Sequence, residues 1–158
     1  DADGVIGDAR GWEGAPALAV QTADCLPVVF SAASGQVVAA VHAGRRGLLG
    51  GILAEAARRI RGLVDGPIEA LIGPAIFGRC YEVPADMADE SASFVPGIRS
   101  VTSWGTPALD LPHAAAASLE ALGVSVDIDE RCTLEDVGLF SYRADPSCGR
   151  QALIIVPA

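Results

Sequence analysis

The sequence predicts an α/β fold in which mixed β-sheets and packed helices form a layered domain. Short apolar runs typical of buried strands alternate with helical patterns in the first half of the chain, and strand patterns dominate both ends. The chain has 158 residues, of which 51% are hydrophobic and 20% are charged. A chain of this size buries roughly two-thirds of its unfolded surface. We therefore expect residues 1–158 to form a single domain with its own core.

Each element follows from a local pattern. The predicted strands are the runs at 5–6, 17–20, 26–30, 37–41, 67–72, 124–128, 140–143 and 152–156. Apolar side chains at three- and four-residue spacing predict one amphipathic helix over 48–63. A short helix is expected at 84–93, and Pro112 suits the first turn of a helix that stops at Gly123. Weak periodicity with several Pro and Gly predicts a surface connection over 94–108.

The composition and the charge exclude several classes of function. The net charge is −9, whereas nucleic-acid binding requires a basic surface. The chain has no lysine, which excludes Schiff-base catalysis and a Walker A loop, and no asparagine, which excludes a Cys-His-Asn triad. No apolar run approaches the roughly 20 residues of a membrane span. We expect the partner to be a small molecule, with no nucleic acid and no membrane.

The cysteines indicate a cellular compartment, and the first residues indicate that a further segment precedes the chain. The four cysteines are Cys25, Cys80, Cys132 and Cys148; they form no C-x-x-C pair, and no signal peptide precedes them. This pattern is typical of a reduced cytoplasmic protein. Since the chain starts at Asp1 without an initiator Met, we expect it to be the later part of a longer protein.

Two strand patterns each adjoin a residue that can bind a metal. Cys25 lies between the runs 17–20 and 26–30, and His42 closes the run 37–41. If these strands are neighbours, the thiol and the imidazole meet at one end of a sheet. The residues alone leave two interpretations open, because Cys25 is either a ligand or a small core residue, and His42 is either a site residue or a satisfied core histidine.

An anion site is predicted directly after His42. The sequence there is Ala-Gly-Arg-Arg-Gly followed by a helical pattern. Gly44 and Gly47 therefore give the backbone conformational freedom where a helix begins. A helix N-terminus offers free N–H groups, and Arg45 and Arg46 add guanidinium groups that bind anions. The sequence therefore predicts an anion-binding group beside the candidate metal ligands.

The remaining thiols and polar residues have simpler interpretations. Cys80, Cys132 and Cys148 fall in loops, where thiols act as ligands only if the fold gathers them. His113 falls in the first turn of a helix, where we expect a solvated or capping residue. Surface positions are expected for Arg143, Arg150 and Gln151 beside a C-terminal hairpin, and for the polar loop at Glu135 and Asp136.

Several short motifs occur in order along the chain. They are Gln-Thr-Ala-Asp-Cys-Leu-Pro from residue 21, Ala-Val-His-Ala-Gly-Arg-Arg-Gly from residue 40, Ile-Gly-Pro-Ala-Ile from residue 72 with Cys-Tyr-Glu-Val from residue 80, Cys-Thr from residue 132, and Phe-Ser-Tyr-Arg from residue 140 with Gly-Arg-Gln-Ala from residue 149. In this order and spacing the chain resembles the YfiH family, also called the laccase-domain or polyphenol oxidoreductase family, over essentially its whole length.

The resemblance implies a layered α/β fold and a monomeric cytoplasmic enzyme that binds zinc through two His and one Cys. It implies phosphorolysis of adenosine, inosine, guanosine and methylthioadenosine, and deamination of adenosine. Carried over by motif, Cys25 and His42 are two of the metal ligands and are predicted catalytic residues. The third ligand is a His expected before residue 1, and His113 does not take its place.

The arginines complete the predicted site. Arg46 is assigned a catalytic role as the residue that holds phosphate, and Arg45 and Arg143 are weaker candidates for binding phosphate or substrate. The family usually has Trp at the position of Arg45, and Gly or Cys is common at the position of Phe77. These two departures predict a shifted substrate preference.

Three alternatives stay open at the level of sequence. With copper in place of zinc the protein is a polyphenol oxidase, although multicopper oxidation needs many His ligands and the chain has two. Without a metal, Cys25 as nucleophile and His42 as base make a hydrolase or deamidase. The third alternative is a binding module without catalysis.

Overall fold

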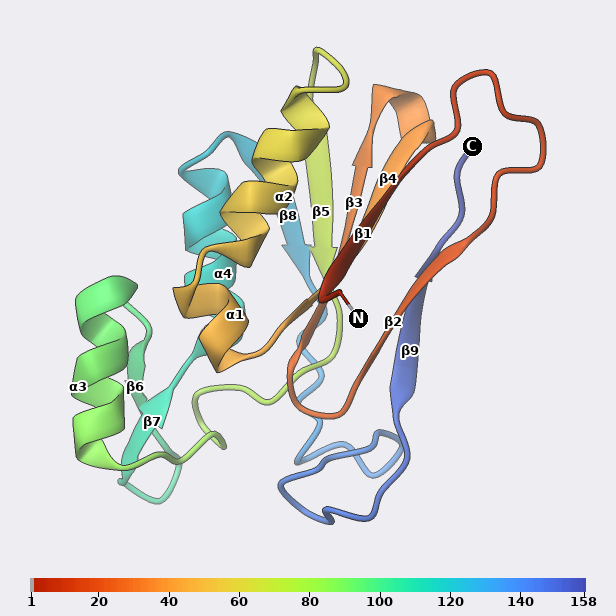
Figure 1. The fold of residues 1–158 in the computed structure, drawn as a ribbon. Helices are drawn as coiled ribbons and strands as arrows, with labels where there is room; N and C mark the ends of the chain where they lie inside the picture. Colours follow the sequence, from red (N-terminus) through yellow and green to blue (C-terminus); the bar gives the residue numbers. More distant parts are fainter. Residues whose placement is uncertain (1) are drawn as a thin grey trace.

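A five-stranded mixed β-sheet forms the centre of the computed structural model, which describes residues 2–158 (Figure 1). The strands in spatial order are β1 (Gly4–Asp8), β4 (Val37–Ala43), β3 (Leu26–Ala32), β5 (Ile68–Ile72) and β8 (Val124–Ile128). The β5 and β8 strands run parallel, whereas the other neighbours are antiparallel. The predicted α/β class with mixed sheets is confirmed.

Two further layers enclose this sheet. The helices α2 (Ile52–Arg61) and α4 (Leu111–Glu120) pack on one face, where the short α1 (Arg45–Leu49) precedes α2. An antiparallel ribbon of β2 (Leu18–Thr22) and β9 (Gln151–Ile155) covers the other face (Figure 1). The longest helices among residues 2–158 have ten residues, and none of them has the length and apolar character needed to cross a membrane.

The β3 and β4 strands are buried on both faces, which explains their continuous apolar sequence. Successive side chains of a strand point to opposite faces. Val28 and Phe30 belong to the main core under the helices, whereas Val29 packs against the ribbon with Val20 and Leu153. In a sheet with one solvated face, polar residues occupy every second position of a strand. Strands that are covered on both faces lack this alternation.

The predicted single helix over 48–63 is wrong, because two glycines divide it. The first piece, α1, begins earlier than expected and ends at Leu49, and Gly51 takes the left-handed conformation with φ 78° before α2 begins. Of the predicted apolar stripe, Leu53, Ala56 and Ile60 are buried, whereas Leu63, beyond the end of α2, is exposed. Arg45 and Arg46 consequently lie in the first turn of α1 rather than before a long helix.

The segment predicted as a surface connection over 94–108 contains a small hairpin. After α3 (Ala85–Phe94), which confirms the predicted short helix, β6 (Arg99–Val101) pairs with β7 (Pro107–Leu109). Strands of three residues are too short to produce a visible two-residue period, which explains the error. The turn between β3 and β4 is the 3-10 helix η1 (Ala33–Gly35).

The predicted strand over 140–143 is also wrong, because other partners take its backbone hydrogen bonds. The N–H of Phe140 donates to Oε1 of Gln151 at 2.9 Å, and the N–H of Arg143 donates to the carboxylate of Asp24 at 2.7 Å. Side chains thus satisfy the donors that a neighbouring strand would satisfy in a sheet. Arg143 and Arg150 therefore flank an irregular loop and not the expected hairpin.

Replacing Gly51 with Ala is expected to lower the free energy of unfolding by about 1–2 kcal/mol, because a β-carbon is strained at φ 78°. Gly47→Ala is the matched control. A β-carbon at Gly47, within α1, would lie 3.5 Å from Ile52, so this change is expected to be neutral or to raise stability by up to about 1 kcal/mol. Urea denaturation measures both variants, and equal effects would contradict the break between α1 and α2.

Candidate functional site

Cys25 and His42 lie at the same end of the central sheet. In the β3–β4 pair, Pro27 is opposite His42, and Leu26 is opposite Ala43, so Cys25 directly precedes β3 where β4 ends. Cys25 is half-buried, and the side chain of His42 is 39% exposed. The hairpin formed by β3 and β4 thus brings the two side chains together across its open end.

Gly44 leaves room for these two side chains to approach each other. A β-carbon at Gly44 would lie 3.0 Å from Sγ of Cys25 and 3.7 Å from Nε2 of His42. Both atoms therefore lie within 4 Å of the position that this β-carbon would take. Any larger residue at position 44 would fill this space.

Asp3 contacts the imidazole of His42 at its Nδ1 atom. The Nδ1 atom of His42 lies 3.2 Å from Oδ1 of Asp3, and the backbone N–H of His42 donates to the backbone oxygen of Asp3 at 2.7 Å. With Nδ1 engaged by a carboxylate, Nε2 is the nitrogen on the side of Gly44. A carboxylate in this position fixes the ring orientation and the tautomer of a metal-binding histidine.

Asp24 joins two loops that are distant in the sequence, beside Cys25. Its carboxylate accepts hydrogen bonds from Oγ1 of Thr133 and from the N–H of Arg143, both at 2.7 Å, and its backbone oxygen accepts one from the N–H of Ile76 at 3.0 Å. The backbone of Asp24 is left-handed, with φ 85°, a conformation that Asp adopts more readily than most residues. The loop after β5 and the long connection between β8 and β9 therefore meet at Asp24.

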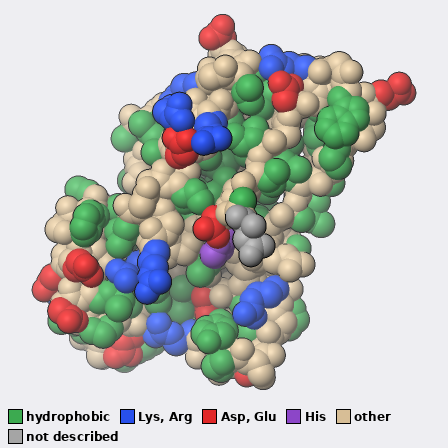
Figure 2. Space-filling view, in the orientation of Figure 1, with side chains coloured by type: hydrophobic (Ala, Val, Ile, Leu, Met, Phe, Trp, Pro, Cys, Tyr) green, Lys and Arg blue, Asp and Glu red, His purple; other side chains and the backbone are tan. Residues whose placement is uncertain are grey.

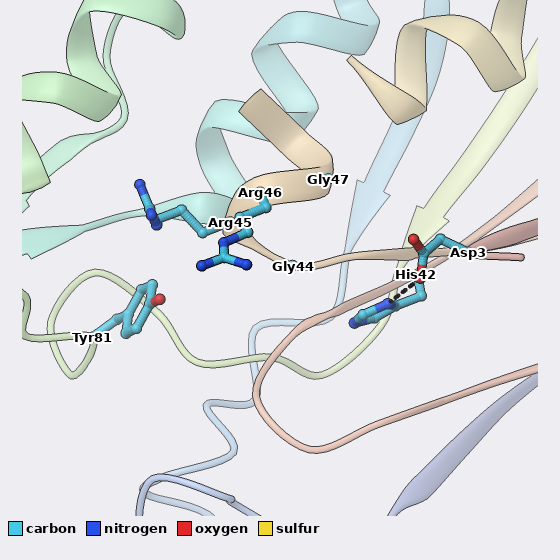
Figure 3. A pocket seen from close by; sticks show the side chains of 7 residues that line it. All are labelled: Asp3, His42, Gly44, Arg45, Arg46, Gly47 and Tyr81. Carbon is cyan, nitrogen blue, oxygen red and sulfur yellow. Dashed lines mark hydrogen bonds and ion pairs between the residues drawn. The ribbon is translucent and has the colours of Figure 1, made fainter. Parts of the chain in front are cut away.

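Two adjoining pockets open beside these residues. The first has a volume of about 360 Å³ and lies between His42 with Asp3 and the start of α1, with Tyr81 at the other side (Figure 3). The second has a volume of about 280 Å³ and a largely apolar lining that includes Cys25. Tyr81 and Arg45 line both pockets, so the two share a wall. In Figure 2 a hollow on this face exposes histidine and acidic side chains, with arginines nearby.

All five predicted site residues line one of the two pockets. The first pocket holds His42 and Arg46, the second holds Cys25 and Arg143, and Arg45 lines both. The fold thus brings together residues that are up to 118 positions apart in the chain. Their roles in metal and substrate binding stay predictions.

The three arginines differ in the contacts that they already make. Arg45 donates from Nη1 to Oγ of Ser91 in α3 at 3.3 Å. The guanidinium of Arg143 lies over the ring of Tyr81, 5.2 Å from its centre. The exposed side chain of Arg46 forms no ion pair with any of residues 2–158. Arg46 is therefore the arginine of this site whose guanidinium is most available to an incoming anion.

Burial raises the pKa of two groups in the second pocket. The pKa of the Cys25 thiol is raised mainly by burial and further by the charge of Asp24, against a smaller opposite effect of Arg150. The pKa of Tyr81 is also raised mainly by burial, and Arg143 opposes that shift. At neutral pH the Cys25 thiol keeps its proton unless a bound cation replaces it.

His113 lies outside this site, at the start of α4. Its backbone N–H and its Nδ1 both contact the carboxylate of Asp110, the N-cap residue, at 3.4 and 2.8 Å. The ring edge also packs against Phe77. The interpretation of His113 as a capping residue agrees with these contacts.

Several residues of functional interest escaped the sequence analysis. Asp3 lies close to the chain start and carries no pattern, whereas Asp24 and Tyr81 are direct neighbours of Cys25 and Cys80 in the motifs. The fold also gathers thiols that spacing alone did not connect, because Cys80 is buried beside Cys132. Burial, followed by the effects of Cys132 and the nearby Glu135, raises the pKa of Cys80 to about 12.

Comparison with known proteins identifies relatives of the chain. Residues 1–158 match the family described as multi-copper polyphenol oxidoreductase laccase. A protein of Mycobacterium bovis named purine nucleoside phosphorylase is 48% identical over 142 residues, which cover 88% of this chain and 57% of that protein. The purine nucleoside phosphorylase YfiH of Shigella flexneri is 40% identical over 150 residues, with 87% and 58% covered. The chain thus spans less than two-thirds of the length of these relatives.

The solved structures agree with the sequence relatives. The crystal structure of protein NMB0706 from Neisseria meningitidis superimposes with a TM-score of 0.81 at 36% identity, covering 100% of this chain and 66% of that one. The layered α/β arrangement is therefore the fold of these relatives as well. The resemblance found in the sequence motifs is confirmed, and the chain belongs to the YfiH family of laccase-like polyphenol oxidoreductases.

Proposed function

We propose that this chain is part of a zinc-dependent purine nucleoside phosphorylase. The observation that carries the proposal is the convergence of Sγ of Cys25 and Nε2 of His42 beside Gly44, next to pockets with arginines and tyrosines. The relatives named purine nucleoside phosphorylase support the substrate class. Since the chain spans less than two-thirds of their length, the activity is proposed for the whole protein.

The residues beside Gly44 suit a zinc ion. Thiolate and imidazole are common zinc ligands, and the contact of His42 with Asp3 is the support that such a ligand usually has. We propose that a His in a segment preceding residue 1 is the third ligand; the position of Asp3 beside His42 brings that end of the chain to the site. Zinc held by three protein ligands supplies a Lewis acid with one open position.

The two pockets suggest how a nucleoside and phosphate bind. Phosphate occupies the first pocket, where Arg46 binds it and Arg45 adds a second cation. The purine occupies the second pocket, where the rings of Tyr81 and Tyr142 offer flat apolar surfaces and Arg143 orients Tyr81. The ribose then lies at the shared wall, with its C1′ atom facing the phosphate, so that binding aligns the two reactants.

The proposed substrates are adenosine, inosine, guanosine and methylthioadenosine, and the same purine pocket is proposed to serve adenosine deamination. Arg45, which stands where the family usually has Trp, places a charge on the wall shared by both pockets. This difference favours a changed substrate preference within the purine nucleosides. We further propose that residues 1–158 act as a single domain of a monomeric cytoplasmic protein.

Two observations disfavour the alternative functions. A multicopper oxidase needs many His ligands, whereas the chain has only His42 and His113, and His113 pairs with Asp110 at α4. A metal-free Cys-His hydrolase needs a reactive thiolate, whereas burial and Asp24 raise the pKa of Cys25. Both observations favour zinc over the alternatives.

Replacing Cys25 with Ser and His42 with Ala together is expected to remove about one equivalent of bound zinc and to abolish phosphorolysis of inosine, because two of three ligands are lost. Zinc is measured by mass spectrometry and turnover by release of hypoxanthine, in this chain and in the form with the expected N-terminal segment. Cys148→Ser is the control, since Cys148 lies in another loop. Full turnover in the double variant would refute the metal-binding role of Cys25 and His42. If the longer form without substitutions binds nucleoside but does not turn it over, the protein is a non-catalytic binding module.

Replacing Asp3 with Asn is expected to weaken zinc binding at His42 by about 10- to 100-fold, because the carboxylate that orients the imidazole becomes a neutral amide. Asp8→Asn is the matched control, since Asp8, the last residue of β1, pairs with Arg10 away from the site. Competition with a chromophoric chelator measures the affinity. Equal affinities of the Asp3 and Asp8 variants would show that Asp3 does not support the metal.

Replacing Arg46 with Ala is expected to raise the phosphate KM by about 10- to 100-fold, the effect of losing a charge-assisted hydrogen bond, with a smaller change in the inosine KM. Arg58→Ala removes the same charge from α2, where Arg58 pairs with Glu55, and is expected to leave both KM values unchanged. Steady-state kinetics at varied phosphate measures the effect. An unchanged phosphate KM in the Arg46 variant would count against its proposed role.

A further inference from the structure

Two cysteines that are 52 positions apart meet at one edge of the central sheet. The parallel strands β5 and β8 end side by side, with Ile72 opposite Ile128. The loops that follow them continue in register, because Ala75 bridges to Cys132 and the N–H of Thr133 donates to the oxygen of Ala75 at 3.0 Å. This pairing brings Cys132 close to Cys80, which lies further along the first loop.

Glu135 completes a group of three potential metal ligands with these cysteines. The sulfur atoms of Cys80 and Cys132 and a carboxylate oxygen of Glu135 all lie within 4.8 Å of one another. Both cysteines are buried, with 3% and 2% of their surface exposed, whereas Glu135 is exposed. The backbone oxygen of Cys132 accepts a hydrogen bond from the N–H of Glu135 at 3.1 Å, and this turn folds the carboxylate back over the sulfur atoms.

We propose that Cys80, Cys132 and Glu135 form a second metal site, separate from His42, that binds a soft divalent cation such as zinc and stabilises the fold. Two sulfur ligands and one carboxylate are a zinc-type set, with water as the fourth ligand. The ligand atoms of a tetrahedral zinc ion lie about 3.8 Å apart. Atoms already within 4.8 Å of one another reach this spacing through small side-chain rotations.

The charges around the three ligands balance those of a divalent cation. Binding replaces the two thiol protons, which pass to solvent, so the ligands carry three negative charges. The cation supplies two positive charges, and Arg79 supplies the third, because its Nε lies 2.8 Å from Oε2 of Glu135. The guanidinium of Arg79 also lies 4.8 Å from the ring centre of Phe77, which keeps it at the edge of the site. One oxygen of Glu135 can thus retain Arg79 while the other binds the cation.

A cation bound by Cys80, Cys132 and Glu135 would stabilise the loops that line the pockets and would not contact the substrate. Tyr81, which lines both pockets, follows Cys80 in the chain, and Thr133, which donates to Asp24, follows Cys132. Linking the two cysteines therefore holds the loops that carry Tyr81 and anchor Asp24. Cys80, Cys132 and Glu135 themselves line neither of the two pockets.

The test uses the Cys25→Ser, His42→Ala double variant as the starting protein, so that the first candidate site contributes no metal. The protein is kept reduced, stripped with a chelator, loaded with zinc and desalted before metal analysis. About one equivalent of zinc is expected to remain, and further replacement of Cys80 or Cys132 with Ala is expected to remove it. Cys148→Ala, added to the same starting protein, is the control and is expected to retain the zinc.

Two measurements keep the proposal testable if a buried substitution disturbs folding. Glu135→Gln changes an exposed side chain and is expected to weaken zinc binding at least about 10-fold while far-ultraviolet circular dichroism stays unchanged. Cobalt added to the starting protein is expected to give the near-ultraviolet absorption of sulfur-to-metal charge transfer. Absence of bound zinc in the starting protein, or binding that survives loss of both Cys80 and Cys132, would overturn the proposal.

Discussion

The arrangement of the site depends on the hydrogen bonds of Asp24. This one residue holds the loop after β5 and the long connection between β8 and β9, and both of them line the second pocket. The carboxylate of Asp24 accepts the two hydrogen bonds from the β8–β9 connection, and hydrogen bonds to a charged acceptor are stronger than neutral ones. Because Asp24 directly precedes Cys25, the residue that anchors the loops also sets the position of the candidate ligand.

The central sheet determines the position of His42. Burial of β3 and β4 on both faces fixes the register in which Pro27 is opposite His42, because a shift by one residue would turn every side chain to the other face. The absence of a side chain at Gly44 then leaves space beside Sγ of Cys25 and Nε2 of His42. A rigid core thus positions the imidazole, while hydrogen-bonded loops position its surroundings, a combination that suits a site of defined geometry.

The two proposed metal sites are built on the same principle, with different consequences. At each one, side chains at or just beyond the ends of adjacent strands meet at one edge of the sheet, because Cys25 precedes β3 where β4 ends, and Cys80 and Cys132 lie in the loops after β5 and β8. His42 is partly exposed beside the pockets, as a catalytic ligand needs to be. Cys80 and Cys132 are almost fully buried, and of the three proposed ligands at the second site only Glu135 is exposed to solvent. A partly exposed ligand beside the pockets suits chemistry, whereas buried thiol ligands that link two loops suit a structural role.

The sequence by itself determined the α/β class, most of the strands and helices, and the pairing of Cys25 with His42. These features depend on local patterns and on a hairpin between consecutive strands, which the order of the chain already implies. Only the tertiary structure decided that Cys80 meets Cys132, that Asp3 supports His42 and that Asp24 binds Thr133 and Arg143. Those contacts join residues 39 to 119 positions apart, where no periodic pattern links the partners, so the packing of sheets and loops alone brings them together.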